Sequence, residues 1–178
     1  MSATISSINY CPVKSVSFQT IKNCKIKKDI GIVSDRIFAF AKDLDKDQAK
    51  LFEKSPDDRK GKWNKVLTLK NSPVLNKYNF IFKYEKLTLT LKDKEILTID
   101  INQSEQREAL SNKISELESS LKQPITLMKN HEFPFFDTSI SNKVNFVNSV
   151  SLLNIQSIND FREKIDRNVE SSIFRGNI

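Results

Sequence analysis

Three consecutive runs of alternating apolar residues constrain the fold more than any other feature of this chain. In each run the apolar positions are two residues apart: Phe80, Phe82 and Tyr84; Leu87, Leu89 and Leu91; Leu97, Ile99 and Ile101. This spacing predicts strands with one buried face, because successive side chains of a strand point to opposite sides. Short polar connections separate the runs, at residues 85–86 and 92–94. We therefore expect an antiparallel meander.

Further strand-like segments lie on both sides of the meander. Residues 4–10 and 18–26 are predicted as strands flanking Pro12, which suits a bend better than a central ladder. Residues 37–41 are apolar on both alternating faces, so both faces of that strand are expected to be covered. Residues 124–129 add one more strand. Together with the meander, these strands are sufficient to curl into a small barrel.

The hydrophobic period changes after residue 101. Spacings of four, three and four predict one helical stripe through Leu110, Ile114, Leu117 and Leu121. Asn102 and Glu105 are predicted to cap the start of this helix and Pro124 to end it. We expect it to cover the open end or the side of the barrel.

The segments outside the predicted barrel and its helix differ in character. Residues 43–77 are polar and are expected to be irregular. Asp43, Asp45 and Asp47 have the spacing of a calcium loop, but the required glycine and glutamate are missing, which excludes that site. A second helix is predicted after a cap at Ser149 or Ser151. The predicted class is mainly β with α, that is α+β.

The charge balance favours an anionic partner. The formal net charge is +7, which is compatible with nucleic acid, an acidic membrane surface or a phosphorylated cofactor. The 29 Lys and Arg residues are interspersed with 22 Asp and Glu residues, so this charge is weak evidence for nucleic acid. The densest lysine cluster is interpreted as a strand edge protected against pairing: Lys22, Lys25, Lys27 and Lys28.

Several classes of site are excluded by the residues themselves. With three glycines in the chain, the Walker and dinucleotide-binding loops are absent. The single histidine, His131, has no partners at metal-ligand spacing, and Cys11 and Cys24 do not form a short metal-binding pair. Both cysteines are expected to be reduced. No secretory signal and no membrane span are evident, so a cytoplasmic location is expected.

Any phosphate must then be held by side chains and isolated backbone amides. Lys14 and Ser15 follow Pro12 in the predicted bend at residues 12–15, which we call the Pro12 corner. Arg36 directly precedes the predicted strand at 37–41, and Arg175 and Asn177 lie near residue 178. Lysine meets a phosphate as a point charge and arginine as a two-pronged fork, so these residues are expected to converge on one. Two alternatives stay open: Arg36 forms a structural salt bridge, and Lys14 is a solvated turn lysine.

The order of these motifs resembles that of MOSC-domain proteins. Pro12, Val13, Lys14 and Ser15, followed by Asp35 and Arg36 before an apolar strand, resemble the family's N-terminal barrel. The opening of the MOSC domain is resembled by Phe136, Asp137 and Thr138, then Val150, Ser151 and Leu152, then residues 174–178. The resemblance implies an N-terminal β-barrel domain at 1–130 and the beginning of a MOSC domain at 131–178.

The resemblance also implies a cofactor and an activity. The cofactor is molybdenum cofactor (molybdopterin), with these residues in its site: Lys14, Ser15, Arg36, Asp137, Thr138, Ser151, Arg175 and Asn177. The family is further associated with pyridoxal phosphate. The implied activity is an oxidoreductase that reduces N-hydroxylated small molecules with electrons from a partner redox protein.

This sequence departs from the family at the metal. A complete MOSC domain continues past the 174–178 motif and supplies a cysteine thiolate to molybdenum, a position that neither Cys11 nor Cys24 matches. The chain is therefore predicted to be truncated relative to the family. One alternative is a non-catalytic carrier of the cofactor or pterin. A weaker alternative is a basic barrel that binds nucleic acid.

Overall fold

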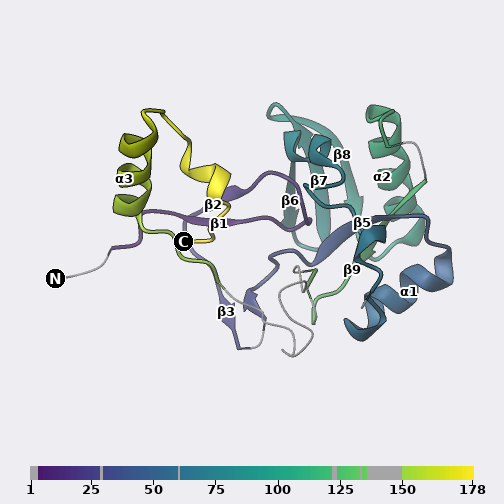
Figure 1. The fold of residues 1–178 in the computed structure, drawn as a ribbon. Helices are drawn as coiled ribbons and strands as arrows, with labels where there is room; N and C mark the ends of the chain where they lie inside the picture. Colours follow the sequence, from purple (N-terminus) through teal and green to yellow (C-terminus); the bar gives the residue numbers. More distant parts are fainter. Residues whose placement is uncertain (1–3, 29, 60, 122–123, 133, 136–149) are drawn as a thin grey trace.

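The chain has a mixed α+β fold, in agreement with the predicted class (Figure 1). A computed structural model describes residues 4–28, 30–59, 61–121, 124–132, 134–135 and 150–178. Within these ranges the helices are α1 (Lys46–Lys54), α2 (Ser104–Leu117) and α3 (Ile155–Ile165). The strands of the same ranges are β1 (Ile8–Tyr10), β2 (Gln19–Ile21), β3 (Ile26–Lys27), β4 (Gly31–Ile32), β5 (Phe38–Lys42), β6 (Tyr78–Lys83), β7 (Lys86–Leu91), β8 (Lys94–Asp100) and β9 (Ile125–Lys129).

The predicted meander is confirmed. β6, β7 and β8 form one antiparallel sheet, in which Phe80 pairs with Leu89 and Leu89 pairs with Leu97. Two-residue turns join the strands, at residues 84–85 and 92–93, and all four turn residues have positive φ. Such turns match the right-handed twist of the flanking strands. Phe80 and Leu89 are fully buried, as the alternation predicts.

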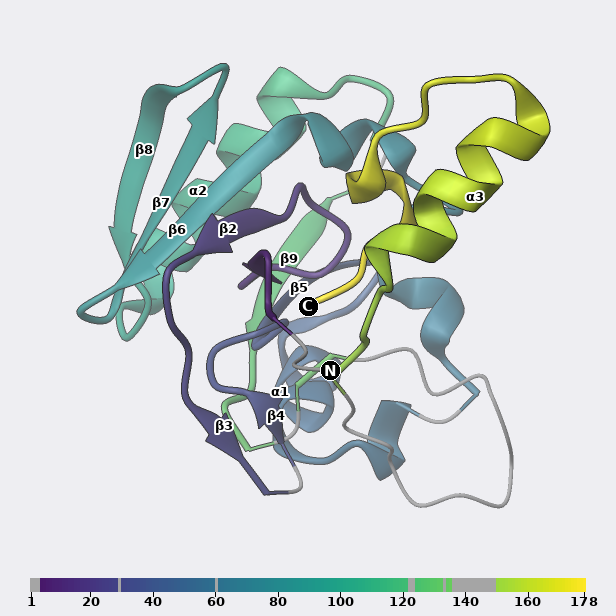
Figure 2. The ribbon, with the colours of Figure 1, turned by 90° about the vertical axis from the view of Figure 1, so that its left-hand side faces the viewer.

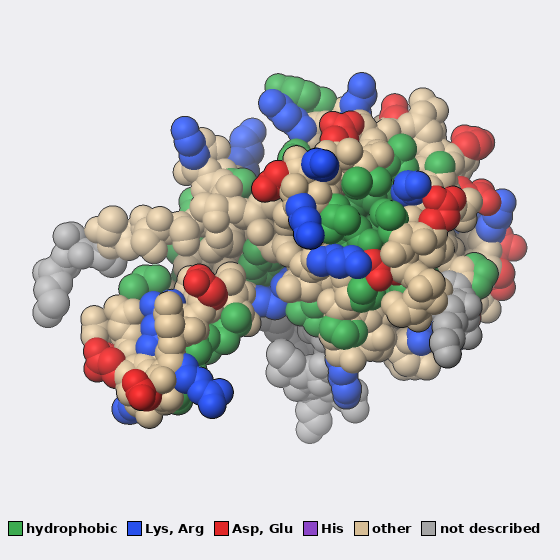
Figure 3. Space-filling view, turned by 90° about the horizontal axis from the view of Figure 1, so that it is seen from above, with side chains coloured by type: hydrophobic (Ala, Val, Ile, Leu, Met, Phe, Trp, Pro, Cys, Tyr) green, Lys and Arg blue, Asp and Glu red, His purple; other side chains and the backbone are tan. Residues whose placement is uncertain are grey.

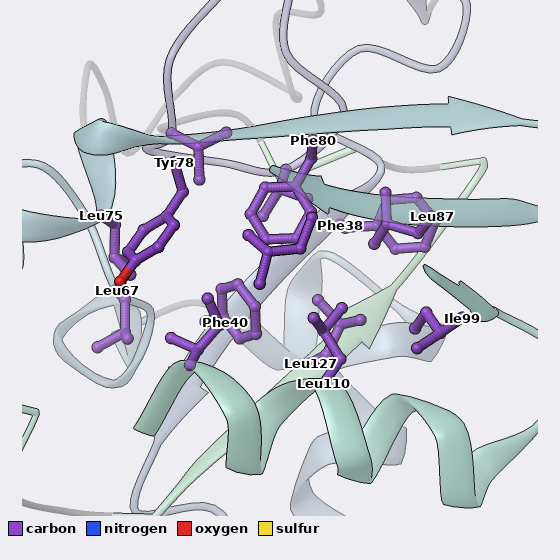
Figure 4. Packing of buried hydrophobic residues seen from close by; sticks show 14 of the residues in the cluster. Phe38, Phe40, Leu67, Leu75, Tyr78, Phe80, Leu87, Ile99, Leu110 and Leu127 are labelled. Carbon is purple, nitrogen blue, oxygen red and sulfur yellow. The ribbon is translucent and has the colours of Figure 1, made fainter. Parts of the chain in front are cut away.

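β5 lies at the centre of the core and pairs antiparallel with β9. One face of β5 places Phe38 and Phe40 in a cluster with the meander and with Leu110 of α2, which Figure 4 shows from close by. The other face places Ala39 and Ala41 in a second cluster that includes residues of α1. Both faces of β5 are therefore covered, as its sequence predicts.

The described strands form four small sheets rather than one continuous ladder. The sheets are β1–β2, β3–β4, β5–β9 and β6–β7–β8. Isolated bridges add to them, from Val13 to Phe38 and from Ala41 to Val66. Hydrogen-bonded pairing among the described residues does not close into a barrel. α2 packs against β8 and β9 and so covers the side of these strands.

The segment 43–77, which was expected to be irregular, contains helix α1 and three short 3-10 helices. Asp45 is the N-cap of α1 and accepts hydrogen bonds from the backbone N–H groups of Asp47 (3.0 Å) and Gln48 (2.8 Å). Ala49 and Phe52 are buried one turn apart on its inner face. The acidic residues Asp45 and Asp47 therefore belong to the start of a helix. The 3-10 helices span Asp57–Arg59, Trp63–Lys65 and Pro73–Lys77.

The observed helix caps differ from the predicted ones, and Ser149 lies outside the described residues. Gln103 is the N-cap residue of α2 and makes no side-chain cap hydrogen bond. α2 ends at Leu117 because Glu118 turns inward, where it accepts a hydrogen bond from the Tyr78 hydroxyl and pairs with Lys77. α3 is capped by Asn154, whose side chain accepts from the N–H of Ser157 at 3.1 Å.

The last residues of the chain return to the N-terminal strand. α3 stands apart from the body of the molecule and is followed by a 3-10 helix at Ser171–Phe174 (Figures 1 and 2). The chain then runs back beside β1, where the N–H of Asn9 donates to the carbonyl of Asn177 at 2.6 Å. Phe135 packs in the second core cluster. The division into domains at residue 130 stays a prediction.

Two neighbouring residues of β6 test the register of the meander. Phe80 is fully buried, whereas the side chain of Ile81 is 47% exposed on the opposite face. We expect Phe80→Ala to lower the free energy of unfolding by about 3–5 kcal/mol, because it leaves a cavity in the core. The matched Ile81→Ala change should cost less than about 1 kcal/mol. Urea denaturation measures both, and equal losses would contradict the register.

Candidate functional site

The Pro12 corner is fixed to β5 by two backbone hydrogen bonds. The N–H of Phe38 donates to the carbonyl of Pro12 at 2.9 Å, and the N–H of Lys14 donates to the carbonyl of Phe38 at 2.8 Å. The N–H of Arg36 donates to the carbonyl of Cys11 at 2.8 Å. These bonds place the corner directly beside the residues that precede β5.

The carboxylate of Asp35 joins three segments of the chain. Asp35 is only 1% exposed. Its Oδ1 accepts from the N–H of Cys11 at 2.8 Å, and its Oδ2 lies 3.0 Å from a guanidinium nitrogen of Arg36 and 3.3 Å from Nδ2 of Asn177. Burial raises the pKa of Asp35, and the charge of Arg36 and the hydrogen bonds only partly oppose that rise. The salt bridge of Arg36, one of the two alternatives left open by the sequence, is therefore present within a larger junction.

Asn177 fixes the C-terminal segment at this junction. Its Nδ2 donates to the carbonyl of Asn9 at 3.1 Å as well as to Asp35. Its Oδ1 accepts from the N–H of Ser151 at 3.3 Å and from the Ser151 hydroxyl at 3.0 Å. Since the side chain is 1% exposed and bonded at both ends, it has a positioning role in this structure. Direct contact of Asn177 or Ser151 with a cofactor stays a prediction.

Gly176 allows the C-terminal segment to pass close to Leu153. A Cβ atom at position 176 would lie 2.3 Å from Cγ of Leu153 and 2.5 Å from its Cδ1. Such distances are far below van der Waals contact, so any other residue would displace Leu153 or the segment. Gly176 therefore keeps Arg175 and Asn177 in place.

Two guanidinium groups meet at the ring of Phe18. The central carbon of the Arg36 guanidinium lies 5.4 Å from the ring centroid and that of Arg175 lies 4.4 Å from it. Arg175 also donates to Oδ1 of Asn76 at 3.0 Å and to the carbonyl of Val16 at 2.9 Å. The convergence of Arg36 and Arg175, which are 139 positions apart (175 − 36), is thus observed.

The backbone around this pair is held in an uncommon conformation. Ser15, Arg36 and Arg175 have φ values of 69°, 53° and 52°, in the left-handed region that non-glycine residues seldom adopt. For Arg175 this conformation is that of a helix C-cap, because Arg175 ends the 3-10 helix Ser171–Phe174. All three were selected from the sequence as site residues.

Both guanidinium groups of the pair are positively charged at neutral pH. Burial lowers the pKa of Arg175, and the neighbouring charge of Arg36 acts in the same direction. Arginine nevertheless stays protonated at neutral pH. Among the described residues, Arg36 pairs with the carboxylate of Asp35, whereas Arg175 donates to the uncharged oxygens of Asn76 and Val16. This arrangement favours binding of an anion.

Cys11 lies beside the pair but is protonated. It is fully buried, and its Sγ donates to the carbonyl of Val13 at 2.6 Å. Burial raises the pKa of Cys11 to about 11, although the charges of Arg36 and Arg175 act in the opposite direction. A metal requires the thiolate. Among the described residues there is also no group of three or more His, Cys, Asp and Glu residues that could hold a metal ion.

The remaining predicted site residues are placed differently. Lys14 is 8% exposed, and its Nζ lies 5.7 Å from the centroid of the Trp63 ring, so it is buried rather than solvated. Asp137 and Thr138 lie outside the described residues. Phe18 was missed by the sequence analysis, although an aromatic residue three positions after Ser15 is compatible with a cation site.

Other surface features lie apart from this cluster. A hollow of about 330 Å³ contains none of the predicted site residues and is lined by Leu44, Gln48, Leu51, Phe52, Lys62, Asn64 and Lys65. On the face shown in Figure 3, Lys and Arg side chains are interspersed with Asp and Glu side chains.

Comparisons with known proteins leave the family open. No family model matches the chain, and no curated protein or solved structure matches it either. Within the part of the chain that the structure describes, none of the helices is sufficiently long and apolar to cross a membrane.

The buried carboxyl of Asp35 predicts a specific pH dependence. Its folded-state pKa is raised above the ordinary value of 3.8, so the folded chain binds this proton more tightly than the unfolded chain. The resulting stabilisation is present below the unfolded pKa and is lost as the pH rises through the folded pKa. We therefore expect wild type to gain stability relative to Asp35→Asn as the pH falls from about 7 to about 4.

Urea denaturation at each pH measures this difference in unfolding free energy. The Asp93→Asn variant removes an exposed carboxylate from the turn between β7 and β8 and controls for the loss of one acid. A difference between wild type and Asp35→Asn that stays constant, or that moves the opposite way, would contradict the raised pKa of Asp35.

The two cysteines are expected to differ in reactivity. Cys11 is fully buried with a raised pKa, whereas Cys24 is partly exposed. An aromatic disulfide reagent at about pH 8 should therefore modify only Cys24 in the native chain and both thiols after unfolding. The native Cys24→Ser variant should be unreactive. Rapid modification of that variant would show that Cys11 is accessible as a thiolate.

Proposed function

We propose that this chain binds molybdenum cofactor through its phosphate, in the manner of a MOSC-type protein. The observation that carries the proposal is the meeting of Arg36 and Arg175 on the ring of Phe18. The two arginines come from the separate motifs on which the resemblance to that family rests. Ser15 lies at the same corner with a left-handed backbone.

The residues present suit the phosphate end of the cofactor. Guanidinium groups bind phosphate oxygens with two parallel hydrogen bonds, and each charge-assisted bond contributes about 1.5–3 kcal/mol. Arg175 is held in place by Asn76 and Val16, so little conformational entropy is lost when an anion binds. A bound phosphate would accept hydrogen bonds from both guanidinium groups.

The described residues do not suit the metal end. Cys11 is protonated, buried and bonded to a carbonyl, so it offers no thiolate to molybdenum. Molybdenum cofactor supplies the redox chemistry when it is bound. By resemblance to the family, the activity that we propose is reduction of N-hydroxylated compounds with electrons from a redox partner.

A second candidate is a carrier that holds the cofactor or its pterin without turnover. The protonated, bonded thiol of Cys11 favours this candidate over the reductase for the described part of the chain. Cofactor retained without reductase activity would support the carrier. For either function we propose a cytoplasmic location, which the two free cysteines support.

Cofactor retention in arginine variants tests the proposal. Wild type and the Arg36→Ala/Arg175→Ala double variant would be produced in cells that make molybdenum cofactor. Fluorescence of the released pterin and elemental analysis of molybdenum then measure the cofactor content. Loss of two charge-assisted contacts, at about 1.5–3 kcal/mol each, should weaken binding by two to four orders of magnitude. The double variant should therefore contain almost no pterin.

Two further variants separate binding from folding. Arg167→Ala removes an exposed arginine after α3 and should leave the pterin content unchanged. Arg36→Lys/Arg175→Lys keeps both charges but loses the forked geometry, so it should retain an intermediate amount. Full pterin content in the double alanine variant, or pterin-free wild type, would contradict the proposed function.

A further inference from the structure

The β3–β4 hairpin is a small projection of the molecule. Figure 2 shows β3 and β4 extending away from α2 and the three-stranded sheet. The two strands are only two residues long, and Ile26 pairs with Ile32 while Lys27 pairs with Gly31. An additional bond from the N–H of Val33 to the carbonyl of Lys25 extends the ladder.

The lysines of this projection have no acidic partner among the residues that the structure describes. Four of them are exposed: Lys22, Lys25, Lys27 and Lys28. Within the part of the chain that the structure describes, none of the four forms an ion pair, whereas Lys46, Lys65 and Lys77 do. Residues 1–34 contain five lysines and a single acidic residue, Asp29. The projection is therefore an unbalanced basic surface.

Aliphatic side chains are exposed among these lysines. Ile26 is 64% exposed and Val33 is 41% exposed, whereas Ile32 on the same ladder is buried. An exposed aliphatic group surrounded by lysines suits an interface that has anionic headgroups above hydrocarbon. Residues 19–34 contain no aromatic side chain on which a base could stack. The composition of the hairpin therefore favours a lipid surface over single-stranded nucleic acid.

We propose that the β3–β4 hairpin docks on an anionic phospholipid surface. The lysines contact headgroup phosphates, and Ile26 enters the interface between headgroups and acyl chains. This inference is independent of the proposed cofactor. It differs from the interpretation of the lysines as protection of a strand edge, because edge protection requires no binding partner.

Cosedimentation of the full chain with vesicles tests the docking surface. The vesicles contain either phosphatidylcholine alone or phosphatidylcholine with about 30% phosphatidylserine. Each lysine near such a surface is worth about a fivefold change in partitioning, so Lys25→Gln/Lys27→Gln/Lys28→Gln should weaken binding to the anionic vesicles about a hundredfold. Adding Ile26→Ser to the triple variant should weaken binding to the anionic vesicles further. This additional loss should persist at high salt, where the charges of the lysines are screened.

A matched triple variant distinguishes the hairpin from general surface charge. Lys70→Gln/Lys86→Gln/Lys94→Gln removes the same charge from exposed sites elsewhere and should retain binding within about twofold of wild type. Equal losses in the two triple variants, or wild type that does not bind the anionic vesicles, would overturn the proposal. Hairpin-dependent binding of single-stranded DNA without vesicle binding would overturn it in favour of nucleic acid.

Discussion

The buried carboxylate of Asp35 is the interaction on which the candidate site depends. It joins the N-terminal corner at Cys11, the start of β5 at Arg36 and the C-terminal segment at Asn177. Burying a carboxylate costs free energy unless the group is paired and hydrogen-bonded. Loss of any of the three partners would therefore destabilise the fold, which holds each partner in position. The hydrogen bonds of Asn177 fix the C-terminal segment, and Arg175 of the same segment lies against the ring of Phe18. The distant arginines therefore meet as a consequence of one junction.

Local periodicity was sufficient to predict most of the core. The alternation in β6, β7 and β8 and the two-sided burial of β5 follow from positions in the sequence. Of the stripe predicted for the second helix, Leu110 and Ile114 are buried in α2, whereas Leu117 is exposed and Leu121 lies beyond the end of α2. The sequence predicts one strand at residues 18–26, but this range contains β2 and only the first residue of β3, because the lysine-rich segment leaves the body of the molecule as a hairpin. The composition of a long strand-like segment does not show where the chain passes from one sheet to another.

The remaining differences between prediction and structure have two causes. One local pattern fits two kinds of structure, and some contacts join residues that are far apart in the sequence. Asp45 has the spacing of both a calcium ligand and a helix cap, and Gln48 three positions later is typical of a capping box. α2 ends early because Glu118 binds Tyr78 and Lys77, about forty residues away, which no local pattern contains. Arg36 and Arg175 were selected from motifs, but Phe18 beneath them depends on the tertiary fold.

Crystals of the chain soaked with tungstate would test the central claim most directly. Tungstate is a tetrahedral oxyanion like phosphate, and its anomalous scattering locates it without assumptions about the ligand. Our account places a tungstate ion within hydrogen-bonding distance of the guanidinium groups of both Arg36 and Arg175, beside the ring of Phe18. Anomalous peaks at other lysines or arginines, with none between these two, would contradict it.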